Sequence, residues 1–531
     1  MLKTALVSRR RERALALGIG LLVLLIRAPL VDLPLERDEG EYAYVAWRLE
    51  HGELPYRDWF DQKPPGIFLA YRLALDAPGE PVAAIRWLAA LFCAGAAVAL
   101  FFLARRLLAA PAAGLAAVLL AWTSADPVLP GPIANTELFM LPWLILANLA
   151  FLEVVRGAGP RALLSLIAGA LVGVATCFKQ VAVVDAALFV LLFPLLATGE
   201  RRARRLVHFA GWAALGGLAL WLPILAWFHA HGGLDALLDA VFLHNLSYVS
   251  GLAGEDRIRN LAFGSNALWA MGWGTCVLPV IGIAFLTREP DRWRVYYLGG
   301  WLLSGAIGVS ASGHYFVHYF QQLLPALAVA AAAGTQGLYR VAALRRVPGW
   351  LCGAALVTLA LAQPVLDAAT LWRLDPDQAI RRIYPTNMFE TIPVIADEVA
   401  AVTTPDDEVF VYGSEAQLFF YAQRRSASRY IFLFPLFGRY ADALERQQSV
   451  IDEIRRERPA VILSAPVAQF FGPGLEQELT FWLEDYIEAN YRLHAIVVGD
   501  RGKRGRILRA TDDGYQDSLV GEAWAQIFVR R

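Results

Sequence analysis

Charge is scarce in this sequence. Asp, Glu, Lys and Arg make up 18% of its 531 residues, compared with about 25% in typical soluble domains. The 48 basic and 48 acidic residues also cancel, so the chain has no net positive charge with which to hold nucleic-acid phosphates. The composition therefore excludes an ordinary soluble enzyme and argues against nucleic-acid binding.

Cysteine is equally rare. The four cysteines lie singly inside apolar runs and form no CxxC motif: Cys93, Cys177, Cys276 and Cys352. This spacing indicates neither a disulfide framework nor a thiolate metal site. We expect the four side chains to act as small apolar residues in the protein interior.

Long apolar runs are what the sequence has in abundance. Hydrophobic residues make up 57% of the chain, against roughly 45–50% in ordinary soluble domains even with glycine counted. Residues 162–178, 206–228, 261–286 and 347–366 each approach the length at which a helix crosses a bilayer. The pattern predicts a polytopic α-helical membrane protein.

Arginine clusters punctuate the apolar runs and predict how the chain is threaded. If every cluster is cytoplasmic, an even number of spans must separate neighbouring clusters, and this condition holds throughout. The N-terminus is then cytoplasmic, and eleven spans are predicted at residues 14–31, 82–104, 107–124, 136–155, 162–178, 181–198, 206–228, 261–286, 295–312, 317–339 and 347–371. The alternative for the first span is a cleaved signal peptide, although no small-x-small cleavage site follows Arg27.

This threading predicts a membrane domain at residues 1–371, with a large first outer loop at 32–81, and an outer domain at 372–531. The loop holds eleven acidic and five basic residues. The tail alternates predicted strands (408–412, 460–463) with predicted amphipathic helices (442–456, 475–490). Such alternation is typical of a small α/β domain.

The first candidate site lies just after the first span, in the run Arg37-Asp38-Glu39-Gly40-Glu41-Tyr42. A carboxylate at the membrane surface can take a proton from an incoming hydroxyl, which is the task of a general base. The alternative is structural: Asp38 and Glu41 have the spacing of a helix capping box ahead of a predicted helix at 42–49.

The second candidate is Lys63, in the segment from Tyr56 to Gly66. Pro64 and Pro65 stiffen the chain beside it, so its ammonium projects from a rigid extended segment that suits a fixed anion such as a phosphate. The chain has only four lysines, which favours a specific need for this one. The alternative is an ordinary salt-bridged lysine in a turn.

Two further polar groups lie beside predicted spans. Glu137 is the sole acid among many apolar neighbours, and ionisable groups at membrane depth usually face a cavity or a partner. In the structural alternative, Asn135 caps the following helix and Glu137 lies in its first turn. Lys179 and Asp185 invite the same two interpretations, or they pair with each other.

A polar and aromatic run extends from His314 to Gln322. His314 and His318, four residues apart, would share one helix face and could bind a metal, but no HExxH glutamate accompanies them. The other interpretations are a rim that donates hydrogen bonds to an anion and an interfacial aromatic belt.

In order and spacing, these motifs resemble glycosyltransferase family 39, which includes the bacterial lipid A aminoarabinose transferases and the protein O-mannosyltransferases. The likeness covers about residues 1–330. It implies a C-type glycosyltransferase fold, a sugar donor carried on polyprenyl phosphate, and a glycan, lipid or protein acceptor, all among the lipids of the cell inner membrane. No cofactor is certain from the resemblance, and a divalent metal stays open.

The resemblance also implies roles for individual residues. Asp38 looks like the catalytic acid-base residue, with Glu39 supporting it. The remaining roles are donor-phosphate binding (Lys63, Arg57, His314, His318), a second acidic position (Glu137) and other polar lining (Lys179, Tyr56, Tyr315).

The expected reaction is an inverting sugar transfer in which the acceptor hydroxyl attacks the anomeric carbon while Asp38 takes its proton. Cations such as Lys63 would stabilise the departing phosphate. One competing hypothesis is a lipid or sugar carrier or flippase, with a polar pathway through the membrane. Another is an assembly protein whose outer domain binds a partner.

Overall fold

The chain folds into two compact units. The structure, a computed structural model, describes residues 2–157, 159–250, 252, 254–438, 440–465, 475–499, 504–512 and 523–531. Residues 1–31, 83–227 and 254–373 form one unit, which we call the bundle unit. Residues 32–82, 228–253 and 374–531 form the other, which we call the mixed unit.

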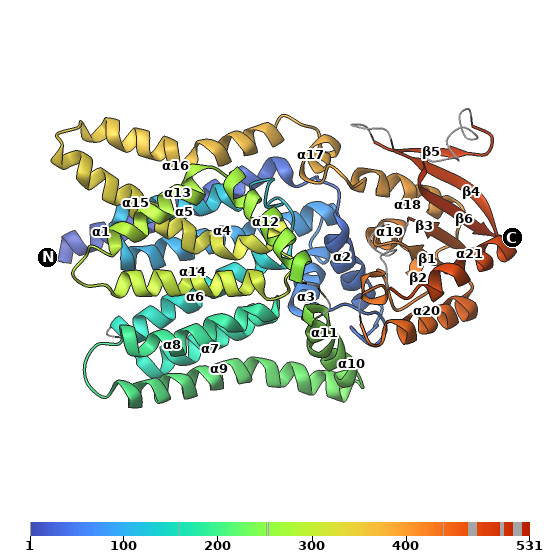
Figure 1. Cartoon of the computed structure of the whole chain (residues 1–531), viewed down its shortest axis with the longest axis horizontal. Coiled ribbons are helices and arrows are strands. Elements are labelled where there is room, and N and C mark those ends of the chain that lie inside the picture. Colours follow the sequence, from blue (N-terminus) through green and yellow to red (C-terminus); the bar gives the residue numbers. More distant parts are fainter. Residues whose placement is uncertain are drawn as a thin grey trace. The chain divides into compact units, whose positions relative to one another are not determined.

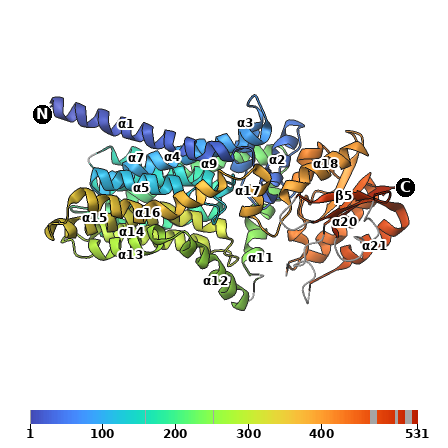
Figure 2. The ribbon, with the colours of Figure 1, turned by 90° about the horizontal axis from the view of Figure 1, so that it is seen from above.

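Helices make up the bundle unit, and Figures 1 and 2 show most of them running side by side, while α12 crosses at an angle. Their bounds are α1 Leu2–Arg27, α4 Pro81–Leu107, α5 Ala110–Thr123, α6 Thr136–Arg156, α7 Arg161–Thr176, α8 Val183–Leu196, α9 Arg202–Ala230, α12 Gly254–Ala270, α13 Trp273–Leu286, α14 Trp293–Ser310, α15 Leu324–Leu344 and α16 Gly349–Leu371. The predicted spans correspond to these helices one by one, except where noted below.

Glycine allows two pairs of these helices to pack closely. A Cβ atom on Gly169 of α7 would overlap the carbonyl oxygen of Ala213 in α9, and one on Gly282 of α13 would overlap that of Ala330 in α15. Small residues at such crossings let helix backbones approach within a bilayer, where the hydrophobic effect does not drive helices together.

The prediction of eleven spans is only partly matched. Among the described residues, five helices are long and apolar enough to cross a membrane, or six if a bent pair counts as one span. That pair is α12 and α13, which meet at an angle of 93°, so the predicted span at 261–286 is not a single helix. The predicted span at 317–339 also begins differently, with a 3₁₀ segment, η4, at Val317–Leu323 before α15.

The arginine clusters converge on one end of the bundle unit, as the predicted threading requires. Ion pairs tie the helix ends and loops together there: Arg105–Glu12 (3.1 Å), Arg106–Glu153 (2.5 Å), Arg156–Asp291 (3.3 Å), Arg294–Glu289 (2.5 Å) and Arg340–Glu289 (3.7 Å). The coarser prediction, a multi-pass membrane protein built from apolar helices, therefore agrees with the structure.

The mixed unit combines short helices with a six-stranded sheet (Figure 1). Its helices are α2 Arg37–Glu50, α3 Gly66–Leu75, α10 Leu234–Leu238, α11 His244–Ser250, α17 Pro376–Ile383, α18 Ile392–Ala401, α19 Gln417–Ala422, α20 Ala443–Glu457 and α21 Glu478–Asn490. The strands are β1 Glu408–Tyr412, β2 Arg425–Ser426, β3 Val461–Ser464, β4 Tyr491–Val498, β5 Arg506–Arg509 and β6 Ala523–Arg530.

The sheet has the strand order β2-β1-β3-β6-β4-β5. Strands β2, β1 and β3 are parallel, with Val409 of β1 opposite Val461 of β3. The other half is antiparallel, with Ile462 of β3 opposite Phe528 of β6. The two predicted strands and two predicted helices of the tail match β1, β3, α20 and α21. The sequence analysis does not predict the other strands and helices of the tail: β2, β4, β5, β6, α17, α18 and α19.

Within the mixed unit, the first loop packs against the C-terminal tail. The guanidinium of Arg37 lies 3.0 Å from the carboxylate of Glu415. The backbone N–H of Phe60 donates to the carbonyl of Arg429 at 2.7 Å, and a Cβ atom on Gly40 would overlap Gln417 of α19. The tail therefore helps to hold the loop that carries the first candidate site.

Candidate active site

The start of helix α2 fixes the position of Asp38. Glu36 is the N-cap, and its carboxylate accepts a hydrogen bond from the Glu39 backbone N–H at 3.3 Å, while the Glu39 carboxylate accepts one from the Glu36 N–H at 3.1 Å. This reciprocal pair is a capping box. The alternative that Asp38 and Glu41 form the box is therefore wrong. Asp38 lies in the first turn, partly exposed, whereas Glu39 is fully buried.

Lys63 lies among carboxylates. Its ammonium is 2.9 Å from the Glu41 carboxylate and 3.5 Å from that of Asp61. Glu41 and Asp61 are buried, while 18% of the Lys63 side chain stays exposed. The rings of Tyr42 and Phe432 lie 5.2 and 5.4 Å from the ammonium, which adds cation–π attraction. We call Asp38, Glu41, Asp61 and Lys63 the acidic cluster.

The charges of the acidic cluster act on one another. Burial lowers the pKa of Lys63, but Asp61, Glu41 and Asp38 outweigh burial and hold it well above its ordinary value. Burial raises the pKa of Glu41 well above its usual range; Lys63 opposes this shift and Asp38 adds to it. Burial likewise raises the pKa of Asp61. The cluster thus pairs a charged lysine with carboxyls that hold protons more tightly than usual.

The backbone around Lys63 is held in place by Tyr56. This residue is fully buried and adopts the left-handed region with φ of 68°, which costs about 1 kcal/mol or more for a residue other than glycine. Its hydroxyl donates to the Lys63 carbonyl at 2.8 Å, and its own carbonyl accepts from Arg429 at 2.8 Å. Tyr56 therefore positions the segment that carries Lys63.

Arg57 has other partners. Its guanidinium forms two hydrogen bonds with the carboxylate of its neighbour Asp58, at 2.7 and 2.8 Å, and one to the carbonyl of His231 at 3.4 Å. About half of its side chain is exposed. None of these contacts joins it to the acidic cluster.

The bundle unit holds a second charged group. Lys179, just before α8, forms an ion pair with Glu137 in the first turn of α6. Glu137 is fully buried and also accepts a hydrogen bond from the Thr136 hydroxyl at 3.0 Å. The Lys179 ammonium lies 3.6 Å from the centre of the Tyr319 ring, and His318 interacts electrostatically with Glu137. Sequence reasoning had named Glu137, Lys179 and His318 separately, and the fold brings them together.

Of the two structural alternatives for this region, one is matched in part and the other is wrong. Asn135 is the N-cap of α6 and Glu137 lies in its first turn, but the Asn135 side chain makes no capping hydrogen bond. Asp185 does not pair with Lys179: its carboxylate accepts from Asn148 at 3.0 Å and from Ser304 at 2.9 Å. Asp185 thus belongs to a buried network that links α6, α8 and α14.

The loop ahead of Glu137 is held by side chains from distant elements. Arg27 donates to the carbonyl of Gly131 at 2.9 Å, Arg86 to that of Pro132 at 3.0 Å, and Gln321 to that of Leu129 at 2.6 Å. All three side chains are buried. Backbone carbonyls saturated in this way keep the loop, and so the start of α6, in one conformation.

His314 and His318 do not share a helix face, because His314 precedes η4 and only His318 lies within it. Each stacks on Phe316, at ring distances of 5.5 and 5.9 Å. Burial, with the charge of Arg257, lowers the pKa of His314 to about 4. Tyr315, between the two histidines, has a φ of 49°.

Metal coordination finds no support in the geometry. No group of three or more His, Cys, Asp or Glu side chains is placed to hold a metal ion within the described ranges. In the acidic cluster, the Lys63 ammonium itself takes the cation position between Glu41 and Asp61.

Comparison with known proteins fits this arrangement. Residues 62–227 match the family model described as dolichyl-phosphate-mannose-protein mannosyltransferase. The matched segment contains Lys63, Glu137 and Lys179 and begins after Asp38. No curated protein matches the chain by sequence.

Solved structures extend the likeness over the whole chain. ArnT from Cupriavidus metallidurans, bound to undecaprenyl phosphate, matches with a TM-score of 0.59 and 18% identity over 93% of this chain and 97% of that one. The oligosaccharyltransferase AglB from Archaeoglobus fulgidus, in complex with an inhibitory peptide and a dolichol-phosphate, matches with a TM-score of 0.53 and 12% identity over 95% and 75%. The chain has the C-type glycosyltransferase fold. The resemblance noted in the sequence is thereby confirmed.

On this C-type glycosyltransferase fold, the predicted site residues separate into two groups. Asp38, Lys63 and Tyr56 meet in the mixed unit, and Glu137, Lys179 and His318 meet in the bundle unit. Sequence reasoning missed the direct partners of Lys63. Glu41 was considered only as a capping residue, and Asp61 only as one acid of the loop, although it lies two residues before Lys63.

Proposed function

We propose that this protein is an inverting glycosyltransferase of the membrane, which moves a sugar from a polyprenyl-phosphate donor to an acceptor hydroxyl at the outer face of the cell membrane. The observation that carries the proposal is the acidic cluster: a partly exposed carboxylate, Asp38, stands next to a charged lysine with a rigid backbone. Family and fold support it, since ArnT of the same fold was solved with undecaprenyl phosphate bound.

In the proposed reaction, the acceptor oxygen attacks the anomeric carbon from the face opposite the phosphate. The new C–O bond forms as the bond to the phosphate oxygen breaks, and the leaving polyprenyl phosphate takes that electron pair. The acceptor proton passes to Asp38. A single displacement of this kind inverts the anomeric configuration.

The acidic cluster provides both a base for the acceptor proton and a cation for the departing phosphate. Lys63 is held in its charged form by three carboxylates, so its exposed side can meet the departing phosphate and stabilise the charge that develops there. Glu41 and Asp61 stay buried behind it. We assign Asp38 as base and Lys63 as donor-phosphate residue, with Glu39 supporting α2 through its capping box. Arg57, His314, His318 and Tyr315 are proposed to border the donor.

We further propose that Glu137 is the second acidic position, with Lys179 as its partner. Their ion pair, backed by Tyr319 and His318, keeps a charged group in the bundle unit at the start of α6. In the acidic cluster the proposed reaction uses Lys63 as its cation.

The decisive experiment offers the purified full chain, in lipid nanodiscs, a panel of polyprenyl-phosphate sugars with glycan, lipid and peptide acceptors. We expect one donor to be consumed, with release of polyprenyl phosphate and a product of inverted anomeric configuration by NMR. Retained configuration would contradict the single displacement. If no donor is consumed while the protein moves lipid-linked sugar between leaflets, a flippase is the better description.

A further inference from the structure

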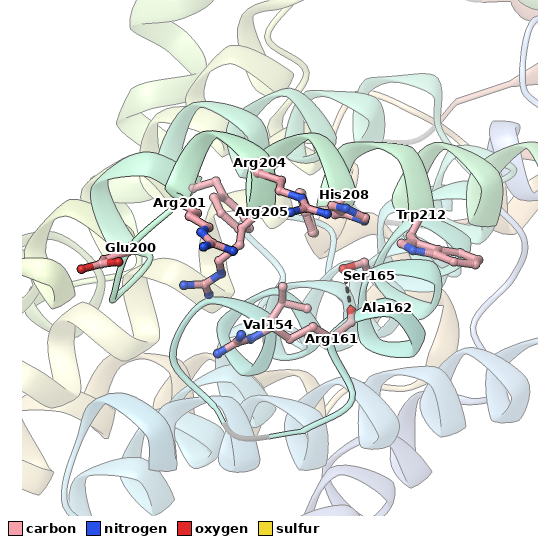
Figure 3. A pocket seen from close by; sticks show the side chains of 12 residues that line it. Val154, Arg161, Ala162, Ser165, Glu200, Arg201, Arg204, Arg205, His208 and Trp212 are labelled. Atoms are coloured by element: carbon pink, nitrogen blue, oxygen red, sulfur yellow. Dashed lines mark hydrogen bonds between the residues drawn. The ribbon is translucent and has the colours of Figure 1, made fainter.

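A basic pocket lies at the arginine-rich end of the bundle unit, and none of its lining residues belongs to the groups used above. It is a cavity of about 430 Å³ between α6, α7, α8 and α9. Its basic residues are Arg161, Arg201, Arg204, Arg205 and His208, and Figure 3 shows them along the first turns of α9 and at the start of α7. We call this cavity the arginine pocket.

The charges of the arginine pocket are not neutralised by protein. Among the residues that the structure describes, no acidic side chain forms an ion pair with any of its four arginines, and Glu200, its one acid, stands apart from them in Figure 3. Arg205 reaches the carbonyl of Thr198 with one nitrogen, but its Nε and Nη2 atoms are buried and have no hydrogen-bond partner. Buried donors of this kind call for an acceptor.

A second basic hollow at the same end provides the contrast. It has a volume of about 270 Å³ and is lined by Arg105, Arg106, Arg294 and Arg340. Each of these arginines has an acid: Glu12, Glu153 or Glu289. Arginines that only mark the cytoplasmic side of a membrane protein can thus be paired in this fold, and those of the arginine pocket are left for something else.

Helix α9 makes the imbalance larger. Its first turn carries Arg202, Arg204 and Arg205 and no acid, although the positive end of the helix dipole disfavours cations there. Arg201, just before it, adopts the left-handed region with φ of 58°. An anion bound in the pocket would offset the charges of these arginines and the positive end of the helix dipole.

The pocket also has an apolar side. Phe193 and Phe209 are buried in its wall, and Trp212 lies one turn further along α9 with 41% of its surface exposed. A shallow groove continues from His208 and Trp212 past Gly211 to Leu215. Only 11% of the apolar window of α9 is buried, so this groove opens onto the surface that faces lipid. The arginine pocket and the apolar groove together match an amphipathic anion, which has a charged group and an apolar chain.

We propose that the arginine pocket binds an anionic membrane phospholipid, with its phosphate among Arg161, Arg204 and Arg205 and an acyl chain in the groove beside Gly211. The match is one of charge and shape: basic pockets between membrane helices recognise lipid phosphates, and each basic residue near the membrane surface contributes about 1 kcal/mol. The site would tie α7 and α9 to the lipid on the arginine-rich side.

The test uses the delipidated full chain and measures lipid binding by native mass spectrometry and thermal stability, with phosphatidylglycerol or phosphatidylcholine as the probe. We expect the wild type to prefer phosphatidylglycerol at least tenfold. The double variant Arg204→Gln/Arg205→Gln should weaken phosphatidylglycerol binding about 30-fold. Arg288→Gln/Arg292→Gln, which removes the same charge from the α13–α14 loop, should change it less than twofold. Equal binding of the two lipids, or no effect of the first double variant, would overturn the proposal.

A second variant tests the groove without removing charge. A Cβ atom on Gly211 meets no atom within 4 Å, so Gly211→Trp should fold and fill the groove, and lower phosphatidylglycerol binding about tenfold. Gly299→Trp, at an equally open position in α14, is the matched control. If inorganic phosphate stabilises the wild type as much as the lipid does and Gly211→Trp has no effect, the pocket holds a free anion and the lipid assignment is wrong.

Discussion

Two lysines, one in each unit, have similar neighbours and different charge balance. Lys63 and Lys179 each contact a buried glutamate and lie near a tyrosine ring. Lys179 forms an ion pair with the carboxylate of Glu137, and the two charges balance. Lys63 is shared by several carboxylates, and burial, helped by the charges of Asp38 and Asp61 and opposed by Lys63, raises the pKa of Glu41. A balanced pair holds helices together, whereas an unbalanced cluster is a place where a proton can be taken up.

Replacing Asp38 should have the largest effect. Asp38→Asn keeps the shape of the side chain but removes the proton acceptor, so we expect sugar transfer to fall by about 10²- to 10⁴-fold. Transfer is measured in membranes with the protein level checked by immunoblot. Asp32→Asn, at an exposed acid of the same segment, should leave transfer unchanged. Normal transfer by Asp38→Asn would remove Asp38 from its proposed role.

Breaking the balanced pair should chiefly affect stability. Lys179→Met leaves the fully buried Glu137 without its cation, and an uncompensated buried charge costs about 3–5 kcal/mol. We expect a lower unfolding temperature in detergent. The double variant Lys179→Met/Glu137→Gln removes both charges and should recover most of the loss. If it is as unstable as the single variant, the ion pair is not the reason for the loss.

Sequence patterns predicted the features that depend on neighbouring residues in the chain, and missed those that depend on contacts between distant elements. Apolar runs and arginine clusters act locally, so most of the predicted spans overlap helices of the bundle unit. The bend between α12 and α13 was missed because residues 261–286 read as one apolar run, and the 3₁₀ segment η4 at the start of the span at 317–339 was missed as well. Asp38 and Lys63 were singled out by their neighbours in the chain. The partners of Lys179 come from α6 and η4, and no local pattern could have assigned them.

Competing local signals explain the other errors. The spacing of Asp38 and Glu41 fits a capping box as well as that of Glu36 and Glu39, and only the buried start of α2 decides between them. Strands β4 and β6 are separated by a long polar stretch, and their pairing is a long-range contact. The arginine pocket looked like a topology signal, because a sequence does not tell which arginines have an acid opposite them.

His244 of α11 is another buried titratable group, and it lies among aromatic rings. Its ring is 5.2 Å from Phe60 and 5.0 Å from Tyr440. Burial, and then the charge of Arg446, lowers its pKa to about 4, with Asp442 opposing. The folded state thus holds His244 neutral, while the unfolded chain takes up a proton near pH 6.5.

Acid should therefore destabilise the folded protein through His244. Stability due to neutral His244 is complete above about pH 6.5 and is lost as the pH falls towards 4, by up to about 3 kcal/mol. His244→Phe should flatten unfolding curves measured between these pH values. His51→Phe, at an exposed ring, should not. An unchanged pH slope in His244→Phe would show that other groups govern acid unfolding.

Replacing Lys63 should give the smallest effect, expressed in donor binding more than in folding. Lys63→Ala removes the contact to the departing phosphate, worth about 1.5 kcal/mol for a hydrogen bond to a charged group, so we expect the donor KM to rise about tenfold. Stability should fall less than in Lys179→Met, because Glu41 and Asp61 already hold protons tightly and can become neutral. Arg72→Ala, whose guanidinium pairs with Glu50 and Asp76 away from the acidic cluster residues, is the control. An unchanged donor KM combined with a large loss of stability would make Lys63 a structural counterpart of Lys179.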